Sequence, residues 1–263
     1  GVIPLSWSLD HCGPMTRTVE DAAIMLQVIA GHDPKDPTTS RTPVPDYSKA
    51  LKDGVRGITI GVPRHYFFNT EKDADPETIA IVDEALAQLE KLGARVEEVS
   101  IPSLEYASTA NNVIMLSEAF AYHRKNLKSQ PQNFGEIVRT RFYLGGLFTG
   151  ADYVQAQRAR SRVAKEFAET LRNVDVIVAP SAPRPAGVIE GFDPFASVMR
   201  PSFTAPFNQS GMPAISIPCG FDGSGLPIGL QIAGRPFDES MVLRVAYTYQ
   251  QQARWHEKHP QLG

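Results

Sequence analysis

The sequence has few cysteines, no long apolar run and no excess of one charge, and each absence excludes a class of protein. Two cysteines in 263 residues, Cys12 and Cys219, are too few for a disulfide framework or a four-ligand zinc site. No apolar stretch approaches the roughly 18 residues that suggest a membrane-spanning helix. The formal charge of −3 gives no basic footprint for nucleic acid. We therefore expect a cytoplasmic protein with no metal or other cofactor, no membrane contact and no direct nucleic-acid partner.

Familiar catalytic motifs are also missing. There is no G-x-S-x-G nucleophile elbow, no phosphate-binding Walker loop, no dinucleotide-binding GxGxxG and no HExxH zinc motif. Asp10, His11 and Cys12 contain the residue types of a nucleophilic triad, but a triad is assembled across a fold and rarely from adjacent residues. We therefore interpret these three as turn and packing residues.

Short apolar runs alternate with segments of helical periodicity, which predicts an α/β fold with a mixed, largely parallel central sheet flanked by helices. Expected strands lie at Gly57–Val62, Arg95–Ile101, Val174–Ala179, Ala214–Pro218 and Ile228–Ala233, the last two joined by a hairpin turn. Expected helices lie at 22–29 after Thr18, at 76–89 after Asp75, at 104–127, at 133–148, after Thr149 and Asp152, and after Asp238. No linker divides the chain, so residues 1–263 are expected to form a single domain.

Several separated segments carry a resemblance to a known family. The opening GVIPLSWSLDHCGPMTRTVEDAAIMLQVIAG and the later FTAPFNQSGMPAISIPCGFDGSGLPIGLQIAGRPFDE flank FGEIVRTRFYLGG, YVQAQRAR and DVIVAPSAP. In this order they resemble the C-terminal part of the amidase signature family of serine amidohydrolases, which includes the A subunit of glutamyl/aspartyl-tRNA amidotransferase. The resemblance implies the amidase signature fold, and residues 1–263 are expected to be the C-terminal part of that domain.

The resemblance also implies a reaction. Members of the family hydrolyse carbon–nitrogen amide bonds with a Ser-cisSer-Lys triad. In the family sequence, these three residues come before the position that corresponds to Gly1. We therefore expect a small-molecule amide as the substrate of the full-length enzyme, no catalytic residue within this chain, and no activity of the chain alone. Two alternatives remain: part of a glutamine-dependent tRNA amidotransferase A subunit, or a non-catalytic binding protein that keeps the pocket.

The resemblance places candidate substrate-binding residues as well. Arg141 falls where amidotransferase subunits have an EVKRR pattern whose Arg clamps a substrate carboxylate, although Arg139 is an alternative and a surface role is open for both. Phe142 and Tyr143 either wall an aromatic substrate pocket or pack in the core. Asn208, with its neighbour Gln209, could hydrogen-bond to the substrate.

One departure from the amidotransferase pattern concerns the residues before Phe203. Amidotransferases hold the substrate ammonium with an Asp just ahead of an FT-P motif, whereas Arg200, Pro201 and Ser202 stand here. The missing acid favours a general amidase over a glutamine-dependent enzyme.

The family's sheet is continuous across its N- and C-terminal halves. A chain without the N-terminal strands would expose a sheet edge and an apolar face at the truncation. The sequence therefore predicts self-association through that face, or low solubility.

Overall fold

The computed structural model describes residues 2–191, 193 and 200–259, which fall into two compact units. Unit 1 comprises the described residues of Gly1–His11, Ile101–Phe167 and Gly187–Gly211. Unit 2 comprises those of Cys12–Ser100, Ala168–Ala186 and Met212–Gly263. That the whole chain belongs to one amidase domain stays a prediction.

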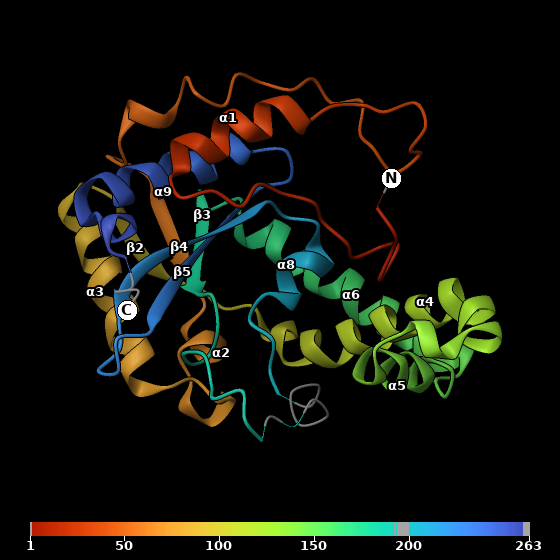
Figure 1. Ribbon diagram of the computed structural model, residues 1–263. Helices are drawn as coiled ribbons and strands as arrows, with labels where there is room; N and C mark the ends of the chain where they lie inside the picture. Colours follow the sequence, from red (N-terminus) through yellow and green to blue (C-terminus); the bar gives the residue numbers. More distant parts are fainter. Residues whose placement is uncertain (1, 192, 194–199, 260–263) are drawn as a thin grey trace. The chain divides into compact units, whose positions relative to one another are not determined.

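Unit 2 is built on a five-stranded mixed sheet in the order β2-β1-β3-β5-β4, which confirms the predicted α/β class (Figure 1). β1 pairs in parallel with both β2 and β3, whereas β5 pairs antiparallel with both β3 and β4. The strands are β1 (Thr59–Val62), β2 (Arg95–Glu98), β3 (Val176–Pro180), β4 (Ala214–Phe221) and β5 (Pro227–Gly234).

The central strands β1 and β3 form where the sequence has short runs rich in β-branched residues. Every residue of β1 and β3 is buried, as expected for strands covered on both faces. At Gly61 the neighbouring side chains leave little room for a larger residue, because a Cβ there would lie 3.0 Å from Val174 Cγ2. Between β4 and β5 the chain reverses through Asp222–Gly225, and Gly225 adopts φ +83°, a value that favours glycine.

Helices α3 and α9 pack on this sheet and complete the core of unit 2. Ile60, Val178 and Ile232 of the strands join Leu86 of α3 and Val245 of α9 in one buried cluster. The unit's helices are α1 (Val19–Ile29), α2 (Arg64–Phe67), α3 (Pro76–Lys91), α9 (Glu239–Ala253) and the 3₁₀ turns η1 (Leu51–Asp53), η2 (Thr70–Lys72) and η5 (Trp255–Glu257).

Three of the residues predicted to cap helices do so, among them Thr149, whose hydroxyl accepts a hydrogen bond from the Asp152 amide at 3.2 Å, and a fourth prediction is wrong. The side chains of Thr18 and Asp75 accept hydrogen bonds from the amides three residues on, which begins α1 and α3. Asp238 occupies the N-cap position of α9 but makes no capping hydrogen bond. Its backbone, with ψ 44°, leaves the extended region that capping requires, and its carboxylate instead lies 3.8 Å from the Arg235 guanidinium.

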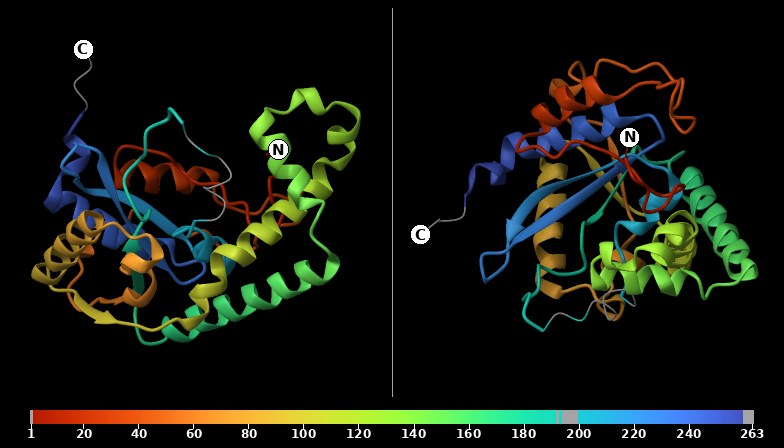
Figure 2. Two further views of the ribbon diagram at one scale, coloured as in Figure 1. Left: turned by 90° about the horizontal axis from the view of Figure 1, so that it is seen from below. Right: turned by 45° about the vertical axis from the view of Figure 1, so that its right-hand side comes forward.

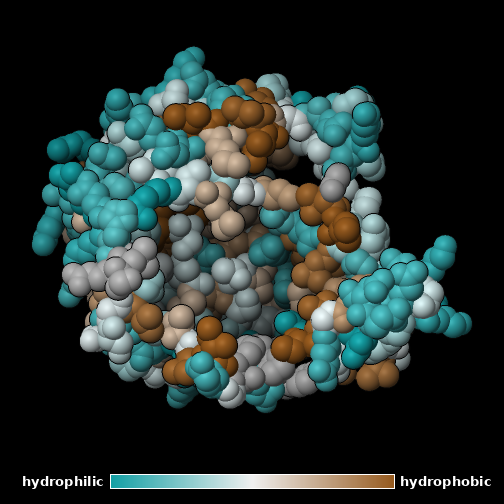
Figure 3. Space-filling model, in the orientation of Figure 1, coloured by the Kyte–Doolittle hydropathy of each residue, from teal (hydrophilic) through white to brown (hydrophobic). Residues whose placement is uncertain are grey.

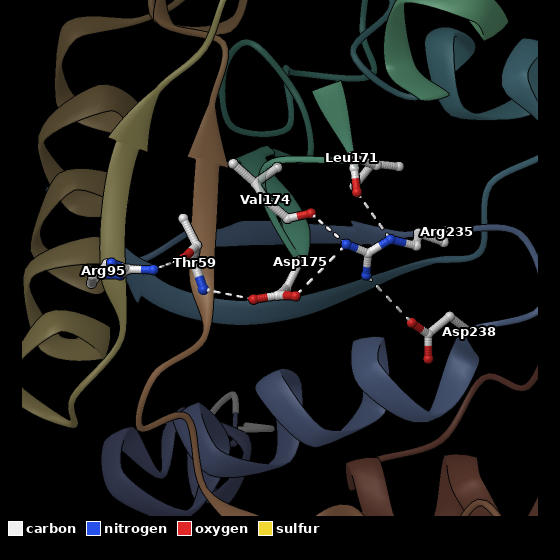
Figure 4. A network of polar contacts seen from close by, with 7 residues as sticks. All are labelled: Thr59, Arg95, Leu171, Val174, Asp175, Arg235 and Asp238. Atoms are coloured by element: carbon white, nitrogen blue, oxygen red, sulfur yellow. Dashed lines mark hydrogen bonds and ion pairs between the residues drawn. The ribbon is translucent and has the colours of Figure 1, made fainter. Parts of the chain in front are cut away.

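The Arg235 guanidinium lies at the centre of a polar network in unit 2 (Figure 4). Its Nε donates to the Leu171 carbonyl at 3.0 Å and its Nη2 donates to the Val174 carbonyl at 2.8 Å. Asp175, 3.7 Å from the same guanidinium, accepts a hydrogen bond from the Thr59 amide at 2.9 Å. The network therefore connects the beginning of β3 to the beginning of β1 and to the end of β5.

Unit 1 is helical, and its described helices pack closely. They are η3 (Pro102–Tyr106), α4 (Ala107–Ser129), η4 (Pro131–Asn133), α5 (Glu136–Gly145), α6 (Gly150–Thr170, of which Gly150–Phe167 belongs to this unit) and α8 (Ala205–Ser210). Ile114 of α4 packs with Ala156 of α6, and Figure 2 shows these two helices side by side. A Cβ on Gly145 of α5 would collide with the Leu116 carbonyl, so glycine permits the close approach of α5 to α4.

Much of the exposed surface of α1 is apolar. Apolar side chains gather over α1, where Ile24, Met25, Val28 and Ile29 are exposed (Figure 3). None of the helices in the described part of the chain combines the length and the apolar character needed to cross a bilayer.

Candidate substrate pocket

Arg141 and Asn208, two of the candidate residues, line one cavity of about 310 Å³ in unit 1. Arg141 projects from α5 and Asn208 from α8. The segment 5–10, α4 and the loop before α8 contribute the other polar walls, among them Ser6, Asp10, Asn111 and Ser202.

The charged side chains that line the cavity are two arginines and one aspartate, and the arginines are the ones with no partner among the described residues. Arg141 and Arg200 both line it, and neither guanidinium makes a hydrogen bond or ion pair with the described residues. The Asp10 carboxylate is already engaged, since it accepts hydrogen bonds from the amides of Leu5 at 2.8 Å and Ser6 at 3.1 Å. An anionic or strongly polar ligand group would therefore be favoured here.

Asn111 adds an unused acceptor to the wall. Its Oδ1 is buried and has no hydrogen-bond partner in the described part of the chain. Leaving a buried acceptor unsatisfied is costly, so an N–H group from a ligand would be stabilised at this position. A primary or secondary amide has such an N–H.

The Glu118 side chain of α4 holds the segment 5–10 that forms one wall. Its carboxylate accepts hydrogen bonds from the Ser6 hydroxyl at 2.7 Å, from the Ser8 amide at 2.9 Å and from the Ser8 hydroxyl at 2.7 Å. Tyr153 of α6 donates a further one at 2.7 Å. Burial alone would raise the pKa of Glu118, but these hydrogen bonds outweigh it and lower the pKa.

Arg160 of α6 fixes the same segment from another direction. It donates to the Ser8 hydroxyl and to the Ser8 carbonyl, both at 2.8 Å, and to the Gln209 carbonyl at 2.9 Å. The guanidinium thus connects the segment 5–10 to the end of α8. The serines of this segment are positioned by charged groups.

Asn208 and Gln209 have different surroundings. The Asn208 side chain lines the cavity, and its Nδ2 donates to the Leu9 carbonyl at 2.9 Å. Gln209 is buried and donates to the Ala107 carbonyl at 2.6 Å, so it contributes to packing between α8 and α4.

The other candidates on α5 do not line this cavity. Phe142 is buried and its ring stacks on His123 at 5.0 Å between centroids. The Tyr143 hydroxyl donates to the Leu127 carbonyl at 3.1 Å, and Arg139 donates to the Pro131 carbonyl at 3.3 Å. Residues two apart on a helix do not share a face, which separates Arg139 from Arg141.

Sequence reasoning missed Asn111 and the neighbouring Asn112 as lining residues. The available signal was two consecutive asparagines inside a helix, a position that this residue type disfavours.

The described residues contain no group of three or more His, Cys, Asp and Glu side chains that is placed to bind a metal ion.

Comparison with known proteins identifies the family. The family model described as Amidase matches residues 1–243. The chain belongs to the Amidase family. This confirms the resemblance read from the sequence motifs.

Two of the relatives that this chain resembles have different names. An amidase of Pseudomonas putida is 43% identical over 275 residues, which cover 100% of this chain and 57% of that protein. The A subunit of glutamyl-tRNA(Gln) amidotransferase from Geobacter sp. (strain M21) is 39% identical, covering 98% of this chain and 58% of that protein. The chain thus spans little more than half the length of these relatives.

The crystal structure of the A subunit of glutamyl-tRNA(Gln) amidotransferase from Thermotoga maritima has the same fold. It superposes with a TM-score of 0.81 at 33% identity, and the match covers 95% of this chain and 54% of that one. This agrees with the predicted amidase signature fold.

Proposed function

We propose that this chain is the substrate-binding part of an amidase that hydrolyses the carbon–nitrogen bond of a small-molecule amide. The proposal rests on the cavity of unit 1 in a chain of the Amidase family. Arg141, Asn208 and Asn111 line this cavity, and Oδ1 of Asn111 has no hydrogen-bond partner among the described residues. In this proposal Asn111 accepts from the amide N–H and Asn208 contacts the substrate. Arg141 binds a carboxylate or another polar group of the substrate.

The nucleophile, in this proposal, is supplied by residues outside positions 1–263. A serine alcohol attacks an amide only when a neighbouring base takes its proton. Ser6 and Ser8 instead donate hydrogen bonds to the Glu118 carboxylate, whose lowered pKa keeps it charged but makes it a weak base. Supporting this, the chain matches only 57% of the length of the Pseudomonas putida amidase. The chain alone would then bind amides without hydrolysing them.

A second candidate is part of a glutamine-dependent tRNA amidotransferase A subunit. It is supported by relatives of that name at 38–41% identity. Against it stands the wall of the cavity at 200–204, where Arg200 and Ser202 take the place of an acid that would bind the ammonium of glutamine. A guanidinium there would repel that ammonium.

Binding measurements on the 263-residue chain separate these candidates. Succinamate carries an amide and a carboxylate, and glutamine has the same two groups with an ammonium and one further carbon. We expect succinamate to bind more tightly than glutamine, and Arg141→Met to weaken succinamate binding about 10-fold or more, the value of a charged hydrogen bond. Arg139→Met is the matched control and leaves binding unchanged. Tighter binding of glutamine would favour the amidotransferase, and equal binding by both variants would refute the role of Arg141.

We also propose that the chain self-associates through the outer edge of β4. β4 ends the sheet order, and a groove of about 730 Å³ runs beside it, lined by Thr16, Val19, Ile215 and Ile217 among others. An uncovered edge strand beside apolar side chains is a template for pairing with another chain. Analytical ultracentrifugation across a concentration series should show dimers or larger species, reduced by the edge charge Ala214→Lys. A monomer at all concentrations would contradict this.

A further inference from the structure

A second groove, of about 810 Å³, lies in unit 2 between the β4–β5 hairpin and the end of the described chain. Residues from three separate segments form it: Arg17 before α1, Phe221 and Leu226 of the hairpin, and Trp255, His256 and Lys258 of the C-terminal turn. Its volume lies within the range of about 300–1,000 Å³ that is typical of small-molecule sites.

The groove has an aromatic wall. The rings of Phe221 and Trp255 meet edge to face, with centroids 5.8 Å apart, and both side chains are half-buried. Leu226, which is partly exposed, extends the apolar surface across the hairpin. Such a surface favours a ligand with an aromatic or branched apolar body.

Cationic groups border this wall. The Lys258 ammonium lies 4.6 Å from the centroid of the Trp255 ring and 5.6 Å from that of Phe221. Arg17 donates to the Lys258 carbonyl at 2.9 Å and approaches His259 Nδ1 at 2.9 Å. These contacts hold the segment that contains Arg17 against the segment that contains Lys258. His256 Nδ1 is buried and has no hydrogen-bond partner among the described residues.

No carboxylate among the described residues lines the groove. The nearest acids in sequence are already engaged, since Asp222 accepts from the amides of Ser224 and Leu226 and Glu257 accepts from Arg254. The charge of Lys258 is therefore not neutralised by an ion pair within the described part of the chain. An anionic group placed beside it would gain a charge-assisted hydrogen bond.

We propose that this groove binds a small organic carboxylate with an aromatic or branched apolar body. The body lies against Phe221 and Trp255, and the carboxylate faces Lys258 and Arg17. The assignment rests on unit 2 alone and does not require that the chain take part in amide hydrolysis.

Three ligands that share a phenylbutyl body and carry negative, neutral or positive head groups test the proposal on the 263-residue chain. They are 4-phenylbutyrate, 4-phenylbutanol and 4-phenylbutylammonium. Trp255 lies in the groove, so its fluorescence reports binding in a Trp7→Phe background, where the exposed Trp7 no longer contributes. We expect saturable binding of the carboxylate, about 10-fold tighter than the alcohol, and the weakest binding for the ammonium.

Variants locate the ligand. Lys258→Met keeps the length of an exposed side chain without its charge, and it should weaken carboxylate binding about 10-fold while leaving alcohol binding unchanged. Lys91→Met removes an exposed charge that does not line the groove and should have no effect. Leu226→Asp, at an exposed position, should abolish carboxylate binding by repulsion.

Four results would overturn the proposal: equal affinity for the carboxylate and the alcohol, no saturable binding, an unchanged affinity in Lys258→Met, or stronger binding of an acidic hexapeptide than of 4-phenylbutyrate. The last would assign the groove to a protein partner. Thermal melts that match the parent chain confirm that the variants are folded.

Discussion

The Glu118 carboxylate accepts hydrogen bonds from both the amide and the hydroxyl of Ser8, a residue 110 positions away in the chain, at 2.9 and 2.7 Å. These contacts hold the segment 5–10 against α4. The same segment forms a wall of the cavity that contains Arg141. The shape of the proposed substrate pocket therefore depends on a carboxylate that does not itself line it.

Replacing this carboxylate should destabilise the protein. In Glu118→Gln an amide N–H₂ replaces one carboxylate oxygen, and each oxygen accepts two of the four hydrogen bonds that Ser6, Ser8 and Tyr153 donate. We expect the free energy of unfolding to fall by about 1–3 kcal/mol, as when buried donors lose a charged partner. Urea denaturation measures the change. Glu90→Gln, on the exposed side of α3, is the control and should change stability by less than about 0.5 kcal/mol.

Acid should weaken the same contacts. The pKa values of Glu118 and Glu166 are lowered in the folded protein, because the hydrogen bonds they accept outweigh the effect of burial. A lowered folded pKa gives stability that is fully present above the unfolded value, about 4.3, and is lost as the pH falls through the folded pKa. Melting temperatures should therefore drop below about pH 4.3, and less steeply in Glu118→Gln. The same acid dependence in that variant would contradict the assignment to Glu118.

The network around Arg235 makes a separate prediction for unit 2. A lysine at position 235 keeps the charge but cannot donate to both the Leu171 and Val174 carbonyls with a planar fork. We expect Arg235→Lys to lower the free energy of unfolding by about 1–2 kcal/mol. Arg158→Lys, at an exposed position of α6, serves as the control in the same denaturation experiment. No difference between the two variants would show that the network is not stabilising.

The two cysteines should differ in reactivity. Burial raises the pKa of the Cys219 thiol to about 12, so almost no thiolate forms at neutral pH, whereas Cys12 is exposed. We expect iodoacetamide to label one thiol in the native chain and two in urea, as counted by intact mass. Cys12→Ser should remove the native label. Rapid native labelling of that variant would mean that Cys219 is accessible.

The fold was predictable where local sequence determines structure. Short runs rich in β-branched residues predicted β1 and β3, and Asp75 followed by Pro76 predicted the beginning of α3. The prediction that Asp238 caps α9 was wrong. An aspartate favours capping, but the backbone conformation that capping requires depends on the neighbouring residues of the chain.

The candidate site was predictable only in part. Arg141 and Asn208 were found through the family motifs, and the structure brings them to one cavity. Phe142, adjacent in sequence, is turned into a stack with His123, because consecutive helical residues point in different directions. Glu118 gave no sequence signal, since Ser6 and Ser8, the residues that it holds in place, lie more than a hundred positions away.

We propose that this chain binds an amide substrate while the attacking nucleophile comes from residues outside positions 1–263. Treating the purified chain with a fluorophosphonate, which phosphonylates activated serines, and then measuring the intact mass tests this most directly, alongside ammonia release from succinamate. We predict an unmodified mass and no ammonia above the buffer blank, with succinamate still bound in the pocket. A phosphonylated serine within residues 1–263, together with amide hydrolysis that its replacement by alanine abolishes, would contradict the claim.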